Sequence, residues 1–522
     1  MTDPATLSPA STPGPARPRT ANDYAAAAAR RRRWFLLGGF ALSLAAGGAF
    51  VAFGLDNIVL PLTLLLCLLT PVLLWNFPRL SLYVTLAAVC LFEMFPTDYH
   101  DALTDKVPFF WNINTIFQIY AHANFKGVPL NLLEILILTA GVCSLLRAVF
   151  SGTVRLRAGA LFVPMAVYMG FVALGWGNGL ATGGDFKISL QEVRGQFYFL
   201  LAYLMAVNLV QEKRQVGAML WITVLCVGLK GILYTFRRYV TLAGQPLPDQ
   251  GVGSHEEAFF FDAFVVLLVV LALCGVHKKL QWAMWALLPF VLTGNLATNR
   301  RAATAAMVVI VPVLLLAAYR ALPQRRRLAA GLGLALIAGF ALYYPAFKNS
   351  DSLFAQPARA IRSNFQPDAR DASSNAARDA ENANLMATVR SAPLRGIGYG
   401  KRYLHVVPMA DISSIYELED YLPHNQVLWV WERLGSFGFL AFWMMIAAVL
   451  VRAGQTAQDV GADADTKAVA LFTLVATGML MVFGLLDLQM SNFRDMLFTG
   501  FWIGALAVAP GLTDGKDARH AR

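Results

Sequence analysis

The stretch RRRRWFLLGGFALSLAAGGAFVAFG, residues 30–54, decides the fold class of this chain. Four arginines are followed at once by about twenty apolar residues, which is the helix length that crosses the hydrocarbon core of a bilayer. A cleavable signal peptide has a shorter apolar core and begins near the first residue, so we predict a retained transmembrane helix with its basic flank in the cytoplasm. Residues 1–29 are rich in Ala, Pro, Thr and Ser and are predicted to form a disordered cytoplasmic tail.

Similar apolar runs fill most of the remaining sequence. Hydrophobic residues make up 57% of the 522 residues and charged residues only 14%, about half the charged share of a soluble protein. This composition excludes a soluble enzyme, a coiled coil and a disordered protein, and predicts an all-α polytopic membrane protein with about 14 (12–14) transmembrane helices. The runs fall near residues 34–54, 57–76, 80–95, 130–150, 160–178, 195–211, 217–236, 258–276, 280–296, 301–319, 328–346, 427–451, 467–488 and 493–511.

The Lys and Arg residues of the short loops predict the orientation of the helices. If the N-terminus is cytoplasmic, the basic loops near residues 79, 147–157, 213–214, 278–279, 320–327 and 452–467 all fall on the cytoplasmic side. The net charge of +11 is therefore a topology signal first, and we expect no nucleic-acid partner. The predicted organisation is an N-terminal bundle of about eleven helices over 30–346, C-terminal transmembrane helices over 427–511 and a cytoplasmic tail over 512–522.

One large loop, residues 347–426, is predicted on the outer face and is expected to be partly helical. Loops of this length inside a compact protein are usually functional or disordered. Several arginines break the topology rule because they lie in this loop or at other outer helix ends. They include Arg194, Arg300, Arg301, Arg378, Arg395 and Arg402. Guanidinium groups that converge on one outer cavity would suit a lipid diphosphate, which they can bind through paired hydrogen bonds.

Other charges allow a structural interpretation. An arginine at a membrane boundary is usually a snorkelling anchor, and we interpret Arg237 and Arg238 in this way. Lys230 lies inside a predicted span, where an ionisable side chain is costly unless it has a function or an acidic partner. Both possibilities stay open for Lys230.

The large loop ends in a cluster of motifs that resembles a known family. It contains PLRGIGYG (393–400), then HNQVL (424–428), and the next predicted helix contains ERLGSFG (432–438). This order resembles the O-antigen ligase and polysaccharide polymerase family of bacterial membrane glycosyltransferases, whose large loop ends in P-L-x-G-x-G-x-G and H-N-x-x-L before a helix with E-x-x-G-x-x-G. SSNAAR (373–378) is similar to the family's arginine-containing entry to the loop helix.

A further segment, TNRRAA (298–303), resembles the family's T-G-S-R-G-A and puts Arg301 at the arginine position. The sequence has Asn-Arg where the family commonly has Gly-Ser, so either Arg300 or Arg301 is the functional arginine. The resemblance implies a multi-pass protein of the bacterial inner membrane with a periplasmic active site, and the Lys and Arg bias of the loops predicts that both termini are cytoplasmic. It also implies a polyprenyl diphosphate-linked glycan donor, and a glycan or lipid A-core acceptor, at the surface of the lipid bilayer.

Elementary chemistry gives roles to the motif residues. An attacking hydroxyl needs a base near neutral pH, and His424 has a side chain of suitable pKa. Arg301 and Arg378, with Arg194, would neutralise the leaving diphosphate without a metal, so we expect no metal site and no cofactor. Asn425 would orient the imidazole or bind sugar hydroxyls. Glu432 lies about two helical turns after His424 and is expected to face the same cavity.

The specific reaction is left open by the sequence. A polysaccharide polymerase, an O-antigen ligase and a transferase of glycans to protein share the donor chemistry, and the large helix count favours a polymerase or an exopolysaccharide ligase. The alternative from another class is a polytopic transporter or a flippase for lipid-linked glycans, although no internal repeat is visible in the sequence. A third possibility is a scaffold of an envelope-assembly complex, which the presence of Arg301, His424 and Asn425 disfavours.

Overall fold

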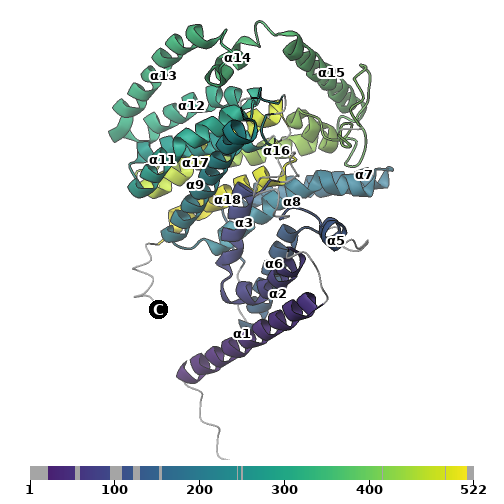
Figure 1. Ribbon diagram of the computed structural model, residues 1–522, viewed down its shortest axis with the longest axis vertical. Helices are drawn as coiled ribbons and strands as arrows, with labels where there is room; N and C mark the ends of the chain where they lie inside the picture. Colours follow the sequence, from purple (N-terminus) through teal and green to yellow (C-terminus); the bar gives the residue numbers. More distant parts are fainter. Residues whose placement is uncertain are drawn as a thin grey trace, which may run out of the picture.

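The computed structural model describes residues 21–52, 59–93, 109–121, 130–151, 156–243, 245–248, 251–254, 256–413, 416–487 and 489–513. Regular secondary structure in these residues is helical, and extended pairing is limited to two isolated bridges, Asn112 with Asn131 and Glu212 with Thr513. The prediction of an all-α protein is thereby confirmed for the described part of the chain. Figure 1 shows the helices gathered into one bundle with a smaller group at one end.

Each apolar run found in the sequence coincides with a helix of the structure. These helices are α1 (Ala21–Ala52), α2 (Val59–Asn76), α3 (Arg79–Leu91), α6 (Leu132–Ser151), α7 (Phe162–Ala181), α8 (Phe186–Leu209), α9 (Lys213–Phe236), α10 (Glu257–Cys274), α11 (Lys278–Ala297), α12 (Arg301–Ala321), α13 (Arg326–Phe347), α16 (Gln426–Gln458), α17 (Ala464–Leu486) and α18 (Phe493–Val508). The short helix α5 (Ile113–Ala121) has no counterpart among the predicted spans. The predicted and observed helices agree closely because the hydropathy of a short segment is enough to identify a membrane helix.

Not every one of these helices is long and apolar enough to cross a membrane. Among the described residues, 7 helical segments meet that requirement, and they contain α9, α10, α11, α12, α13, α16 and α17. Helices α2 and α3 add one more if they form a single broken span, because they meet at Pro78 with a bend of 119°. The structure therefore supports a multi-pass membrane protein, whereas the count of about 14 spans stays a prediction.

The predicted basic loops meet at one end of the bundle. Lys213 at the start of α9 pairs with Asp463 before α17, with Nζ 2.6 Å from Oδ2. At the same end, the Lys467 Nζ donates to the carbonyl of Ala321 over 3.4 Å, and His277 lies 3.2 Å from Asp465. The loops that carry these residues thus share one face, as the distribution of Lys and Arg requires.

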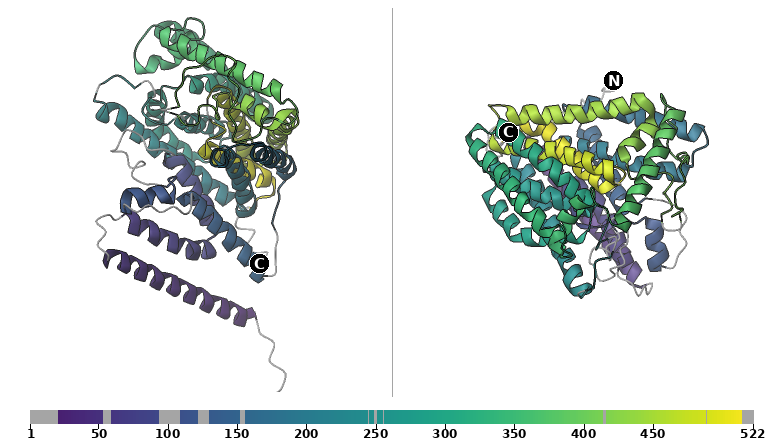
Figure 2. Two further views of the ribbon diagram at one scale, coloured as in Figure 1. Left: turned by 90° about the vertical axis from the view of Figure 1, so that its right-hand side faces the viewer. Right: turned by 90° about the horizontal axis from the view of Figure 1, so that it is seen from above.

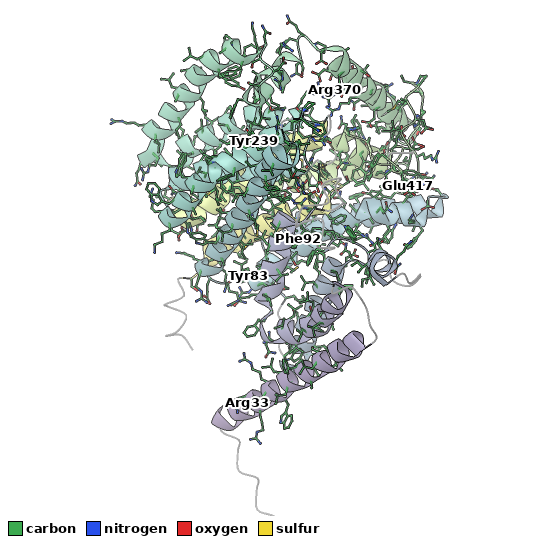
Figure 3. All side chains as sticks on the ribbon, in the orientation of Figure 1. Arg33, Tyr83, Phe92, Tyr239, Arg370 and Glu417 are labelled. Atoms are coloured by element: carbon green, nitrogen blue, oxygen red, sulfur yellow. The ribbon has the colours of Figure 1, made fainter. Side chains whose placement is uncertain are left out.

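Helix α1 lies apart from the main bundle. Figures 1 and 2 show it beyond α2 and α6, and Figure 3 places Arg33 of α1 and Arg370 of the large loop near opposite ends of the long axis. Residues 1–20 of the predicted tail lie outside the described residues. The helix begins at Ala21 and so includes residues 21–29, which the sequence analysis assigns to the tail. The alanines of residues 25–29 favour helix and extend it towards the N-terminus.

The segment between α13 and α16 supplies three further helical pieces. They are a 3-10 turn η3 (Leu353–Ala355), α14 (Gln356–Arg362) and α15 (Ala369–Ser391). Helix α14 packs against α12 and α13, whereas α15 packs against α16. Figure 1 shows α14 and α15 lying over one side of the bundle, so this segment covers the ends of α12 and α16.

Candidate active site

The Gly-rich segment fills a break in helix α16. Gly435 interrupts that helix with φ 67° and ψ −176°, which releases carbonyl groups from the helical hydrogen-bond pattern. The carbonyls of Glu432 and Arg433 instead accept hydrogen bonds from Ile397 N (2.8 Å) and Gly398 N (3.2 Å). A side chain at Gly435 would lie 2.3 Å from the Leu394 carbonyl oxygen, so the close approach requires glycine. The motifs at 393–400 and 432–438 therefore form one structural unit.

A buried ion pair fixes this unit against α8. The Arg433 guanidinium lies 2.7 Å from Glu192 Oε1, and it donates to the carbonyls of Lys401 and Tyr421, each over 2.7 Å. Glu192 also accepts a hydrogen bond from the backbone N–H of Gly400. Both charged side chains are fully buried. Sequence reasoning missed this pair, although an arginine directly after Glu432 inside an apolar helix was a signal that a partner is needed.

Arg301 connects the start of α12 to helix α15. Its guanidinium lies 3.3 Å from Asp371 Oδ1, 3.3 Å from Asn375 Oδ1 and 3.1 Å from Ser374 Oγ. The two sequence segments that carried the resemblance, 298–303 and 373–378, are thus in contact through this one side chain. Ser363 Oγ lies 3.5 Å away as well, so Nη1 and Nη2 of this guanidinium are both engaged by the protein. Through these contacts Arg301 joins the start of α12 to α15.

His424 is held by a carboxylate of helix α15. The Glu381 side chain accepts from the backbone N–H of His424 over 3.0 Å, and its other oxygen lies 3.2 Å from the imidazole Nδ1. Glu381 is buried, whereas the His424 side chain is 39% exposed. The neighbouring Asn425 caps α16 by accepting from Leu428 N over 3.1 Å, and its amide donates to Asn382 Oδ1 over 3.0 Å.

The charges around His424 change its proton affinity. Burial by itself lowers the pKa of the imidazole, but the hydrogen bond and the charge of Glu381, with the more distant charge of Asp487, outweigh it and leave the pKa raised. The positive charge of Arg378 on α15 acts in the opposite direction. The charges of Glu381, Asp487 and Arg378 thus act together on the proton affinity of the imidazole.

Arg300 belongs to the same region. It precedes α12 with extended backbone, and burial lowers the pKa of its guanidinium, against the raising effect of Asp487 and Glu256. The charge of Arg378 lowers it further, so the two arginines are electrostatic neighbours. Arg378 itself is half-buried and makes no hydrogen bond or ion pair with the residues that the structure describes. The charges of Arg378 and Asp487 thus act on both Arg300 and His424.

The remaining predicted site residues lie elsewhere in the structure. Arg194 on α8 pairs with Glu134 on α6, its Nε 3.0 Å from Oε1. Glu432 is fully buried in α16 beside Arg433, at 3.6 Å, within the unit that holds the Gly-rich segment. Arg402 is 71% exposed and contacts Asp420 of the same loop at 3.4 Å. Arg395 is exposed too.

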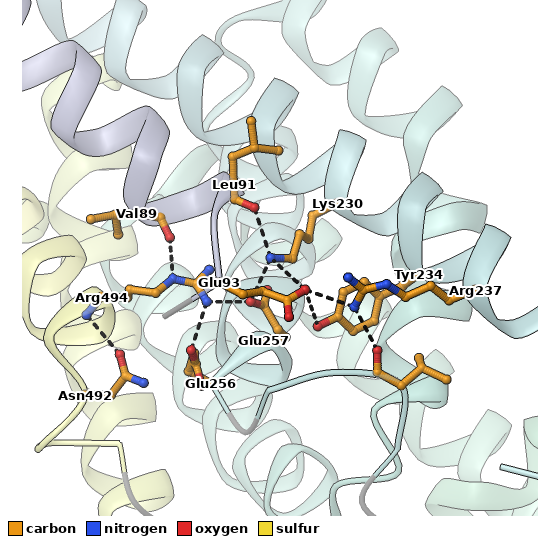
Figure 4. A network of polar contacts seen from close by, with 11 residues as sticks. Val89, Leu91, Glu93, Lys230, Tyr234, Arg237, Glu256, Glu257, Asn492 and Arg494 are labelled. Carbon is orange, nitrogen blue, oxygen red and sulfur yellow. Dashed lines mark hydrogen bonds and ion pairs between the residues drawn. The ribbon is translucent and has the colours of Figure 1, made fainter. Parts of the chain in front are cut away.

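A second cluster of charges lies deep between α3, α9, α10 and α18 (Figure 4). We call it the buried ion network; it consists of Glu93, Lys230, Arg237, Glu256, Glu257 and Arg494. Lys230 lies 3.0 Å from Glu257 and 3.3 Å from Glu93, so its acidic partners are now identified. The interpretation of Arg237 as a snorkelling anchor is wrong, because its side chain is fully buried and lies 2.9 Å from Glu93.

Glu381 is a candidate site residue that the sequence did not reveal, whereas Asp487 was visible only as an acidic residue inside a predicted span. On helix α15, Ser374, Arg378 and Glu381 recur at intervals of four and three residues, which places them on one face. That polar stripe was a usable signal, because a helix lying over a membrane bundle turns one face towards it. Asp487 ends α17 and offered no comparable pattern. No group of three or more His, Cys, Asp or Glu side chains suited to a metal ion occurs among the described residues.

The fold and this site define a multi-pass helical membrane protein whose long connecting segment carries a histidine and arginines over the ends of its helices. Residues 286–443, from the middle of α11 to the middle of α16, match the family model of O-antigen ligase. The match confirms the resemblance for this part of the chain, and Arg300, Arg301, Arg378, Glu381 and His424 all lie within it. It implies a membrane enzyme of the glycosyltransferase type that uses a lipid-linked glycan donor. A search of curated proteins finds no match to the chain.

Proposed function

We propose that this protein transfers a glycan from a polyprenyl diphosphate carrier to an acceptor hydroxyl at the outer face of a bacterial inner membrane. The observation that carries the proposal is the half-exposed His424 imidazole, held by Glu381 within electrostatic reach of Arg378. A base, a residue that orients it and an unpaired cation are the elements that a transfer with an anionic leaving group needs.

His424 serves as the general base. A carboxylate at Nδ1 favours the tautomer that carries its proton there, which leaves Nε2 to accept the proton of the acceptor hydroxyl. Glu381 is a positioning residue in this scheme, because it acts through the imidazole. The proton passes from Nε2 to water after each transfer.

Arg378 and Arg300 stabilise the leaving group. As the acceptor oxygen bonds to the anomeric carbon, the bond from that carbon to the diphosphate oxygen breaks and leaves polyprenyl diphosphate with an added negative charge. Guanidinium groups can neutralise this charge through paired hydrogen bonds, so the scheme uses no metal. Arg301 holds α15, and with it Arg378 and Glu381, in place over α12.

The side of the membrane on which transfer occurs and the type of acceptor are inferred from less specific features than the contacts of His424. The positive-inside rule puts the end of the bundle that carries Lys213 and Lys467 in the cytoplasm and the long segment with His424 in the periplasm. An exposed imidazole at that face is open to a glycan end, to a lipid A-core sugar or to a protein hydroxyl. Polymerase and ligase reactions thus remain alternatives for the same chemistry.

A transfer assay with a matched pair of histidine variants tests the proposal. His424 and His405 have similar exposure (39% and 38%), and each contacts one carboxylate, Glu381 or Asp420. The full chain in lipid nanodiscs is given an undecaprenyl diphosphate glycan and an acceptor, with and without EDTA. We expect transfer to continue in EDTA and His424→Ala to lower turnover by roughly 10² to 10⁴, whereas His405→Ala stays near wild type.

The possible outcomes distinguish a role of His424 as the base from a requirement for a metal and from damage to the fold of the loop. Near-normal turnover of His424→Ala would show that the histidine is structural. Loss of wild-type transfer on chelation would show that the charge neutralisation needs a metal. If both histidine variants lose activity equally, the loop has been disturbed, and the assignment of His424 as base fails.

A further inference from the structure

A group of cations lies at one end of the bundle, where α11 and α13 begin. It consists of Lys278, Lys279, Arg320, Arg325, Arg326 and Arg327, and we call it the basic edge. All of these side chains are exposed, and the positive-inside rule puts this end of the bundle in the cytoplasm. That rule explains the side of the membrane on which the cations lie, but it does not explain why so many of them share one edge.

Contacts between two loops bring these cations together. A Cβ placed on Gly275, which ends α10 shortly before α11, would lie 3.0 Å from Nη2 of Arg325. The turn that leads into Lys278 therefore contacts the loop that leads into α13. The Arg326 guanidinium lies 5.4 Å from the centre of the Tyr319 ring, and its Nε donates to the Tyr319 carbonyl over 3.1 Å. The starts of α11 and α13 thus contribute to one basic surface.

The protein itself does not neutralise the basic edge. Elsewhere at the same end of the bundle, Lys213 pairs with Asp463, and His277 contacts Asp465. Among the residues that the structure describes, no cation of the basic edge forms an ion pair with a carboxylate. Positive charges that lie close together repel one another, so an anion that binds between them is stabilised.

The helices that lead away from the basic edge are suited to contact with lipid. Only 6% of the apolar stretch that contains α13 is buried inside the protein. On α11, Trp282 and Trp285 follow Lys278 by about one and two helical turns, and they are 75% and 54% exposed. Exposed tryptophans are typical of the level of the lipid headgroups. Cations at headgroup level above aromatic and apolar side chains match an anionic phospholipid.

We propose that the basic edge binds an anionic phospholipid with two phosphates, as in cardiolipin. One phosphate lies near Lys278 and Lys279, and the other near Arg325 and Arg327, whose guanidinium groups can each donate two hydrogen bonds to phosphate oxygens. Basic pockets between transmembrane helices on the cytoplasmic side are typical sites for such a headgroup. The bound lipid joins the start of α13 to the start of α11 and so stabilises an outer helix that has little buried surface.

This inference does not depend on the proposed function. Arg301 of the candidate active site and Arg320 of the basic edge lie near opposite ends of α12, about 28 Å apart at 1.5 Å per residue. Lipid binding can therefore be measured without glycan transfer, and either proposal can fail while the other stands.

Native mass spectrometry of the delipidated full chain tests the site. The probes are tetraoleoyl cardiolipin, dioleoyl phosphatidylglycerol, dioleoyl phosphatidylethanolamine and inorganic phosphate. We expect one tightly bound cardiolipin, weaker binding of phosphatidylglycerol, and no retention of phosphatidylethanolamine or of inorganic phosphate, which lacks the acyl chains. Arg325→Ala/Arg327→Ala should weaken cardiolipin binding about thirtyfold, which is the usual effect of losing two cations beside an anionic lipid.

A second pair of arginines gives the matched control. Arg157 and Arg214 are exposed on loops of the same predicted face but lie outside the basic edge. Arg157→Ala/Arg214→Ala should bind cardiolipin as wild type does. Cardiolipin should also raise the thermal unfolding temperature of wild type and of this control, but not that of Arg325→Ala/Arg327→Ala.

Three results would overturn the inference. Equal weakening in the two double variants would show attraction to positive charge in general, and equal retention of phosphatidylethanolamine and cardiolipin would show an unspecific lipid shell. A change from dimer to monomer in Arg325→Ala/Arg327→Ala would show that the edge binds a second copy of the chain. If that variant unfolds without lipid at a much lower temperature than wild type, Lys278→Ala/Lys279→Ala takes its place, and unchanged cardiolipin binding there counts against the site.

Discussion

The buried ion network and the candidate active site contain the same kinds of side chain in different surroundings. In the network, Lys230, Arg237 and Arg494 meet three glutamates between four helices, and every one of these side chains is almost fully buried. In the active site, His424 is 39% exposed and Arg378 has no hydrogen-bond or ion-pair partner among the described residues. A charge that the protein neutralises completely has nothing left to offer a ligand, whereas an accessible and unneutralised charge does.

The largest effect on stability is expected from a variant that breaks the buried ion network. Arg494→Ala leaves Glu256 and Glu257 without the guanidinium that lies 3.0 Å from Glu256. Removing one partner of a buried pair costs about 3–5 kcal/mol, because the remaining charge stays buried. We expect a large fall in the thermal unfolding temperature of the detergent-solubilised protein. Lys187→Ala is the control, because its pair with Glu417 is 75% exposed on both sides and worth little. Equal unfolding temperatures for both variants would contradict the assigned role of the network.

The opposite behaviour is expected for the active-site arginine. Arg378→Ala should leave the unfolding temperature nearly unchanged, because no ion pair with described residues is lost. It should lower kcat for glycan transfer by about 10² to 10³, the usual effect of removing one group that stabilises a developing anion. Arg390→Ala, an exposed arginine on the same helix, should match wild type in both measurements. A stability loss similar to that of Arg494→Ala would place Arg378 with the structural charges.

The smallest effect concerns the pH dependence of transfer. A general base works in its neutral form, so activity should fall as the pH drops through the raised pKa of His424. Glu381→Gln keeps an oxygen that can accept from Nδ1 but removes the negative charge, so the pKa falls. We expect the acid limb of the kcat/KM profile to move to lower pH by about one unit.

Asp420→Asn is the control for that profile, because Asp420 contacts His405 and should not affect the limb. An acid limb that stays in place in Glu381→Gln would show that another group titrates there. The sign is opposite for folding: the stabilisation by the pair between His424 and Glu381 is complete below the unfolded pKa of His424 and is lost as the pH rises through its raised folded pKa.

The sequence predicted the positions of the helices well, but it did not predict which side chains contact one another. The apolar runs predicted the helices correctly, because each helix in a membrane must satisfy the hydrogen bonds of its own backbone groups within about twenty consecutive residues. His424, Arg378 and the motif glycines were identified through their order along the chain. The sequence could not show which of Arg300 and Arg301 contacts α15, and the structure shows that Arg301 does. Arg237 was assigned to the membrane surface because Glu93, its partner 144 residues away, could not be inferred from spacing.

The sequence by itself determined an all-helical, multi-pass membrane protein, because hydropathy and helix length are local properties of the chain, and its motifs named part of the candidate site. Only the tertiary structure decided that Gly435 breaks α16 to receive the Gly-rich segment, that Glu381 holds His424, and that Arg301 at the start of α12 contacts α15. These relations depend on packing between distant segments, which no local pattern specifies.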